Sequence, residues 1–319
     1  MYDGVVGSLR QRVNNIILTA KNDERVEFYD SATHTRLAAL DMPAPVHELA
    51  LTPERAYGTV YGGGIFGKNK DPDHRVVVID LAAREIDGFI DVGAYLAPHG
   101  LMFSADGLLW VTAELNNAIL GIDVIRRKVL AAIDIGGAAH WLTLSPDGKR
   151  AYASHKQMPC LGIIDLLNRR VGGQVNIPNR CEGVALSKDG ARLYVASHAA
   201  PELNVIDTRS DKLIESIRIE GGGADRTQLR RVRISPDERW LLFSSHLDGN
   251  VAIFSLPDLE QTALVKVGKA PMGFGFPAAA DRALVCNHDD GVVSMLDLAA
   301  GTVTASFTTG NGCEFVEYY

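Results

Sequence analysis

The sequence has 319 residues, of which 46% are hydrophobic and 22% charged, and this composition excludes an intrinsically disordered chain. The formal net charge of −7 argues against a general nucleic-acid-binding surface, because phosphate recognition depends on clustered Lys and Arg. The N-terminus has no apolar signal core, and no stretch approaches the roughly 18 apolar residues of a membrane span. We therefore expect a cytoplasmic protein that contacts no membrane, or a periplasmic one if a signal has been removed.

Short strands recur along the whole chain in units of about 43 residues. Each unit has an apolar strand, a turn rich in Ser, Pro, Asp and Gly, a second apolar strand, a third strand and a more polar fourth strand. The third strands end at Asp30, Asp80, Asp123, Asp165, Asp207, Ser255 and Asp297. Four strands per unit and short turns throughout predict an all-β fold, a seven-bladed β-propeller.

The two ends of the chain together complete one unit. The C-terminal GCEFVEYY (312–319) matches the first strand of a unit, and the N-terminal segments NIILTA, RVEFYD and TRLAAL match the other three. A blade shared by both termini closes the ring and leaves no free sheet edge. We therefore expect residues 1–319 to form a single propeller domain.

The repeat also carries a family resemblance. The segments SPDGKRAYAS (145–154) and IIDLLNRRV (163–171), and likewise SKDGARLYVASH (187–198) and NVIDTRSDKLIESI (204–217), resemble the repeat of the YVTN-type, lactonase-like seven-bladed propellers. The resemblance covers essentially the whole chain and implies the fold. Such propellers include hydrolases, lyases, cofactor-binding domains and plain binding proteins, so the resemblance leaves the activity open.

Two positions in each unit carry an unusual number of polar residues. The first lies five residues before the Ser, Thr or Pro that starts the turn, and by unit it is His47, His99, His140, Glu182, Arg230, Met272 and Glu314. The second lies near the end of the second strand, nine or ten residues before the end of the third, and it is Lys21, Glu114, His155, His198, His246 and His288. Both positions lie at the same edge of an antiparallel blade. The sequence therefore predicts a His-rich funnel at one mouth of the central channel.

Imidazoles that converge from adjacent blades favour a divalent transition metal, Zn, Fe, Mn or Cu, of unknown identity. The first expected set of metal ligands is His47, His99 and His140. The competing set is His155, His198, His246 and His288, with Glu114, Glu182 and Glu314 as outer carboxylates. This second arrangement is similar in architecture to that of the carotenoid-cleaving propellers. A buried hydrogen-bond network repeated in the blades is the structural alternative for the first set.

The same side chains suit acid–base chemistry and anion binding, because His titrates near neutral pH and cations stabilise oxyanions. The expected catalytic residues are Glu182, Glu314, Arg230, His198 and His246. The expected substrate-binding residues are Lys21, Glu114, His155 and His288. A salt bridge between Arg230 and Glu182 at the rim is an alternative use of that arginine.

We expect a metal-assisted enzyme of the lyase or hydrolase type that acts on a small anionic organic molecule in the funnel. A non-haem metal-dependent oxidoreductase and a non-catalytic propeller that binds a metal, cofactor or peptide are the alternatives. The four cysteines show no CxxC spacing, so we expect reduced thiols. An insertion at 61–75 is either a flap over the funnel or an ordinary surface loop. The oligomeric state is open, and a monomer is compatible with the sequence.

Overall fold

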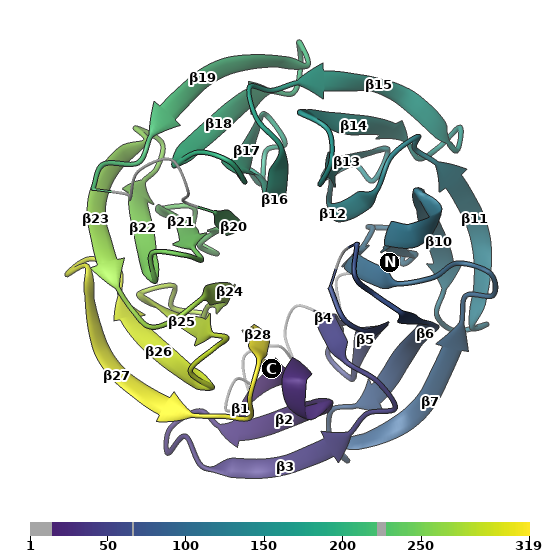
Figure 1. The fold of residues 1–319 in the computed structure, drawn as a ribbon, viewed down its shortest axis with the longest axis horizontal. Helices are drawn as coiled ribbons and strands as arrows, with labels where there is room; N and C mark the ends of the chain where they lie inside the picture. Colours follow the sequence, from purple (N-terminus) through teal and green to yellow (C-terminus); the bar gives the residue numbers. More distant parts are fainter. Residues whose placement is uncertain (1–14, 66, 222–227) are drawn as a thin grey trace, which may run out of the picture.

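The structure is a computed structural model that describes residues 15–65, 67–221 and 228–319. Seven four-stranded antiparallel sheets are arranged in a ring around a central channel (Figure 1). The predicted seven-bladed β-propeller is therefore confirmed. The expectation that residues 1–319 form one domain stays a prediction. No helix within the described ranges is long and apolar enough to cross a membrane.

We name the blades A to G in chain order and give their strands from the channel outward. Blade A contains β28 (Cys313–Tyr318), β1 (Asn15–Ala20), β2 (Arg25–Asp30) and β3 (Arg36–Asp41). Blade B contains β4 (Val46–Leu51), β5 (Arg55–Gly63), β6 (Asp71–Asp80) and β7 (Glu85–Asp91). Blade C contains β8 (Pro98–Phe103), β9 (Leu109–Ala113), β10 (Ala118–Asp123) and β11 (Lys128–Asp134). Two short 3₁₀ turns, η2 (Lys21–Asp23) and η3 (Glu114–Asn116), follow the second strands of blades A and C.

The other four blades follow the same plan. Blade D contains β12 (Ala139–Leu144), β13 (Arg150–His155), β14 (Cys160–Asp165) and β15 (Arg170–Asn176). Blade E contains β16 (Cys181–Leu186), β17 (Arg192–Ser197), β18 (Glu202–Asp207) and β19 (Lys212–Arg218). Blade F contains β20 (Leu229–Ile234), β21 (Trp240–Ser245), β22 (Asn250–Ser255) and β23 (Glu260–Lys266). Blade G contains β24 (Pro271–Gly275), β25 (Arg282–Asn287), β26 (Val292–Asp297) and β27 (Thr302–Thr308).

The recurring sequence features are explained by the turns that they make. The carboxylate of Asp123 accepts hydrogen bonds from the backbone N–H groups of Ile125 and Arg126, at 3.0 and 2.8 Å, and so closes the turn to the fourth strand. In the Ser-Pro-Asp-Gly turn of blade D, the Ser145 hydroxyl donates to Asp147 and accepts from the backbone of Arg150. Side chains that bond to nearby backbone in this way favour turns. These repeated residues therefore specify the fold and carry no chemistry.

The ring closes where both chain ends meet in blade A. Strand β28 pairs with β1, with Ile16 opposite Tyr318 and Leu18 opposite Val316, so the predicted closure is confirmed (Figure 1). A disulfide between Cys286 and Cys313 joins β25 of blade G to β28 across the last interface. The expectation of four reduced thiols is wrong for this pair, because the ring brings their Cα atoms to 5.3 Å, within the range of a disulfide.

Candidate functional site

Strand pairing places the two polar positions of each blade side by side. In blade D, Ala139 pairs with His155, so the residues that follow them, His140 and Lys156, both lie at the channel mouth. The equivalent pairing occurs in all seven blades. Two residues per blade thus form a ring, here called the funnel ring. Its members are Lys21, His47, Tyr61, His99, Glu114, His140, Lys156, Glu182, His198, Arg230, His246, Met272, His288 and Glu314. With Ile65 and Asp289 they line a cavity of about 290 Å³.

One of the twelve predicted site residues lies elsewhere. His155 does not line the funnel; it is 2% exposed and sits inside blade D, where a Cβ added at Gly162 would be 3.0 Å from its Nε2 atom. Lys156 takes the funnel position instead. The sequence contained this signal, because Lys156 lies nine residues before Asp165, which is the regular spacing, and His155 lies ten before it.

Tyr61 is the second residue that the repeat pattern missed. The insertion at 61–75 hides the regular spacing, but Val46 pairs with Val60, so Tyr61 follows the paired position like the other members. The insertion extends the β5–β6 hairpin, with Gly62 opposite Pro72 and Gly63 opposite Asp71. Its residue Ile65 reaches the funnel lining.

Three ligand atoms meet on one side of the funnel. Among the residues that the structure describes, one group can hold a metal: the ligand atoms of His47, His99 and Glu314 all lie within 4.8 Å of one another, and all three residues are buried. Both ring nitrogens of His47 and the Nδ1 atom of His99 have no hydrogen-bond partner among these residues. Buried polar groups are normally hydrogen-bonded, and a metal ion would supply a partner to one nitrogen of each ring.

His140 takes a different part from the predicted one. The centre of its ring lies 3.9 Å from that of His99, with the two planes tilted by 35°. Its Nδ1 atom, however, lies 2.6 Å from Oε1 of Glu114. The other carboxylate oxygen of Glu114 accepts a hydrogen bond from the Tyr61 hydroxyl. The Nε2 atom of His140 lies 3.4 Å from Glu182. Glu314 therefore takes the place of His140 in the group that can hold a metal, and His140 belongs to a chain of acid–base groups beside it. The competing four-histidine set is not assembled, because His155 lies outside the funnel.

Buried threonines of the second strands hold the backbone of the three histidine-bearing strands. Thr19, Thr59 and Thr112 donate to the carbonyl oxygens of His47, His99 and His140, at 3.3, 2.8 and 3.0 Å. Each bond runs from one blade to the next. Thr112 also accepts from the Gly100 N–H at 2.8 Å, within its own blade. The hydroxyls thus fix the spacing of neighbouring blades where the ligands project into the funnel.

The protonation states of His47, His99 and Glu314 favour the binding of a cation. Burial lowers the pKa of His47 and of His99 well below 6.5, so both rings are neutral and free to ligate near pH 7. Burial opposes ionisation of Glu314, but Lys21, 3.4 Å away, and further neighbours that include Arg231 together outweigh this effect, so the pKa of the carboxyl falls. Two neutral imidazoles, each with one unprotonated ring nitrogen, and one ionised carboxylate are in the protonation states that metal binding requires.

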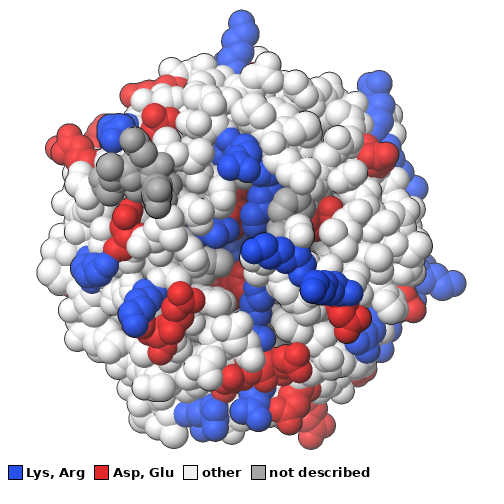
Figure 2. Space-filling model, viewed as in Figure 1, with Lys and Arg blue, Asp and Glu red and all other residues white. Residues whose placement is uncertain are grey.

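A second group of charges lies across the funnel, around Glu182. Arg230 donates to its Oε2 atom at 2.7 Å, and the Nδ1 atom of His198 lies 3.1 Å from the same oxygen. Burial opposes ionisation of Glu182, but Lys156 and Arg230 lower its pKa well below 4.5. The pairing of Arg230 with Glu182 is thus the arrangement that the sequence left as an alternative. Basic side chains surround the mouth and acidic ones lie within it (Figure 2).

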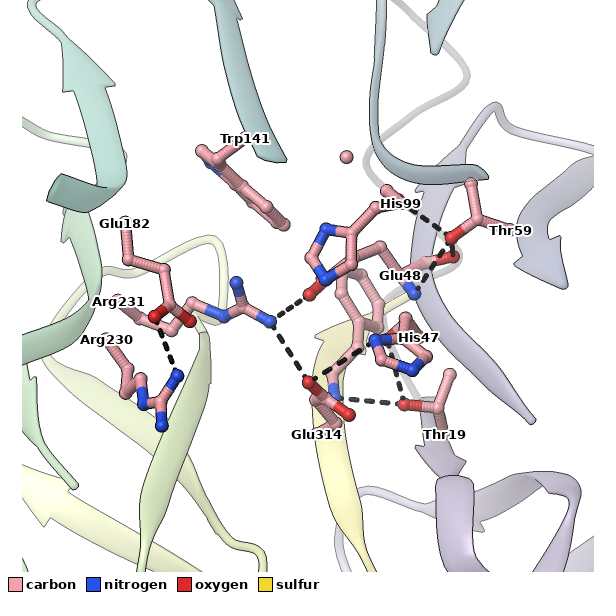
Figure 3. Close-up of polar contacts among 12 residues, drawn as sticks. Thr19, His47, Glu48, Thr59, His99, Trp141, Glu182, Arg230, Arg231 and Glu314 are labelled. Carbon is pink, nitrogen blue, oxygen red and sulfur yellow. Dashed lines mark hydrogen bonds and ion pairs between the residues drawn. The ribbon is translucent and has the colours of Figure 1, made fainter. Parts of the chain in front are cut away.

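The floor of the funnel is made by residues that sequence analysis did not single out. Arg231 donates to the carboxylate of Glu48, lies 3.5 Å from Glu314 and places its guanidinium 4.4 Å from the centre of the Trp141 ring (Figure 3). Arg231, Glu48 and Trp141 each directly follow a funnel-ring residue in sequence. Successive residues of a strand lie on opposite faces, and these three side chains line the deeper part of the channel and not the funnel.

Comparison with known proteins shows the fold and no family. No protein-family model and no curated protein sequence matches the chain. A solved structure of hydrazine synthase from Kuenenia stuttgartiensis is similar over 91% of this chain and 92% of that chain, with 18% identity and a TM-score of 0.72. A functionally unknown protein from Desulfotomaculum acetoxidans matches over 96% of this chain and 98% of its own, with 11% identity and a TM-score of 0.80. Similarity at this identity supports a shared propeller, and the YVTN-type family stays a prediction.

Proposed function

We propose that the funnel binds one divalent transition metal through His47, His99 and Glu314, and that the protein is a metal-assisted enzyme for a small anionic organic molecule. The observation that carries the proposal is the convergence of three buried ligand atoms within 4.8 Å. Two His and one carboxylate are the protein ligands of zinc hydrolases that keep an open coordination position. A metal held in this way supplies a Lewis acid.

The charge of the funnel supports an anionic substrate. Three basic and four acidic side chains line it, so its formal charge with neutral histidines is −1. A divalent ion changes this value to +1, which favours entry of an anion into the funnel. Lys21 of blade A and Arg230 of blade F, with blade G between them, are the residues we assign to orient the substrate's anionic group.

Proton transfer is assigned to the chain's own groups. His140 lies between Glu114 and Glu182, and His198 lies beside Glu182, so each imidazole has a carboxylate that orients it. Such pairs hold a proton at a ring nitrogen and release it to a neighbouring oxygen. These pairs favour lyase or hydrolase chemistry, in which protons must move to and from substrate oxygens.

The same ligand set supports a second candidate, a non-haem metal-dependent oxidoreductase. Two His and one carboxylate with open positions are also the ligands of non-haem Fe(II) oxygenases. The identity of the metal separates the two functions. Zinc or manganese favours hydrolysis or lysis, and iron or copper favours oxidation.

Elemental analysis of protein purified without a His-tag, followed by titration of apo protein with Co²⁺ monitored by visible absorbance, tests the proposal. We expect one equivalent of metal, and binding weakened at least about tenfold in His99→Ala and Glu314→Gln. His198→Gln is the matched control at the same mouth and should bind as the wild type does. Failure of the wild type to bind any of these metals, or equal binding by all four proteins, would overturn the proposal.

A further inference from the structure

The half of the channel away from the funnel forms a second cavity. The innermost strands begin at the funnel ring and run away from it, as β4 does from His47 to Leu51 and β8 from His99 to Phe103. Their far ends line a cavity of about 590 Å³, and no member of the funnel ring is part of its lining. This volume lies in the range of small-molecule sites. The structure thus has two separate chambers along one channel.

The walls of the second cavity are mainly apolar. Side chains from several blades contribute, among them Ala50, Met102, Phe103, Ala185, Phe274 and Phe315. Met102 is 40% exposed although it is large and apolar. Arg233 also lines the cavity, but it is engaged by Glu317 and by the carbonyl oxygen of Phe274. A ligand therefore meets apolar surface over most of its length.

The inner end of the cavity carries a guanidinium with unused donors. Arg231 is 4% exposed, and its Nη2 atom faces Glu48 and Glu314 (Figure 3). Its Nε and Nη1 atoms are buried without a hydrogen-bond partner among the described residues. Buried N–H donors without an acceptor are costly, and a guanidinium is suited to bind a carboxylate. Stacking on Trp141 holds the guanidinium plane in place.

We propose that this second cavity binds a small monocarboxylate with an apolar body, with the carboxylate on Arg231 and the body against the apolar walls. One carboxylate matches the one guanidinium that has unused donors, since Arg233 already has its acceptors. The proposal does not depend on a metal in the funnel. It does connect the two chambers, because Arg231 also contacts the proposed metal ligand Glu314.

Isothermal titration calorimetry with octanoate, and with 1-octanol as its neutral analogue, tests the site. We expect the wild type to bind octanoate about tenfold or more tightly than 1-octanol, because one charge-assisted hydrogen bond contributes that much. Ala185→Trp fills the cavity and should abolish binding of both compounds. Ala191→Trp, on an exposed turn of the same blade, is the matched control and should bind as the wild type does. Arg231→Met should bind both compounds equally.

Two results would overturn the proposal: no octanoate binding by the wild type, or unchanged binding by Ala185→Trp. The far-UV circular dichroism spectrum and the melting temperature of Ala185→Trp show whether that variant is folded. Loss of octanoate binding by a folded Ala185→Trp protein supports the second cavity. Octanoate binding by a protein that takes no metal would contradict only the proposed function.

Discussion

Arg231 and Glu314 connect the two chambers of the channel, because Nη2 of Arg231 lies 3.5 Å from Oε1 of Glu314. The same nitrogen donates to Glu48. Burial raises the pKa of the Glu48 carboxyl to about 8, so near pH 7 the buried charge that Arg231 compensates is chiefly that of Glu314. Removal of one partner from a buried ion pair leaves uncompensated charge in a site with little water. The floor of the funnel therefore depends on Arg231.

We expect Arg231→Met to lower the free energy of unfolding by about 3–5 kcal/mol, as other broken buried pairs do. The double variant Arg231→Met/Glu314→Gln should recover part of this loss, since it also removes the carboxylate charge that Arg231→Met leaves without its guanidinium partner. Urea denaturation of the wild type, both single variants and the double variant gives the coupling energy. If the two substitutions have additive effects on the free energy of unfolding, the two side chains do not form a coupled buried ion pair.

Thr59 tests whether the inter-blade hydroxyls position the metal ligands. Thr59→Val keeps the shape but removes the 2.8 Å bond to the carbonyl oxygen of His99. We expect a loss of about 1–2 kcal/mol in the free energy of unfolding and about tenfold weaker Co²⁺ binding. Thr59→Ser retains the hydroxyl and should bind Co²⁺ nearly as the wild type does. Unchanged Co²⁺ binding by Thr59→Val would show that the hydroxyl does not position His99.

Gly183 tests how closely neighbouring blades must approach at the channel. A Cβ at this position would lie 2.7 Å from the carbonyl oxygen of Arg230, which is backbone and cannot turn aside. We expect Gly183→Ala to destabilise the fold by about 1–3 kcal/mol, as overpacked cores are. Gly173→Ala on the outer strand β15 is the control, because its nearest atom would be 3.9 Å away. Equal melting temperatures of the two variants would contradict the expected contact.

His246 gives the fold a dependence on pH. Burial, with a smaller contribution from Arg230, lowers its pKa from 6.5 to about 4. Between these values the unfolded chain binds a proton that the folded chain does not, so stability is lost as the pH falls from about 6.5 to about 4. We expect His246→Asn to reduce this loss by on the order of 2 kcal/mol. Urea denaturation of both proteins at pH 7 and pH 4.5 measures the difference, and parallel curves would refute the assignment.

Much of the site was predictable from the repeat, because a strand register fixes which edge a residue reaches. Tyr61 and Lys156 were missed for different reasons. Lys156 has the regular spacing of nine residues before Asp165. The residue before it, His155, is a histidine, which is the residue type that three other units have at this position. The insertion after Tyr61 removed the spacing altogether. Arg231 was missed because the sequence does not show which of the two adjacent arginines, Arg230 or Arg231, faces the floor of the funnel.

The sequence by itself determined the seven blades and the shared closing blade, since turn residues and alternating apolar strands act over a few neighbours. Only the tertiary structure decided which funnel residues touch. Glu314 joins His47 and His99 because ring closure places β28 of blade A beside blade B, which is followed by blade C, while His140 turns to Glu114 in its neighbouring blade. Contacts of this kind depend on side-chain direction between blades, which no local pattern records. The disulfide of Cys286 and Cys313 has the same origin, because the two cysteines lie in different blades that meet only in the closed ring.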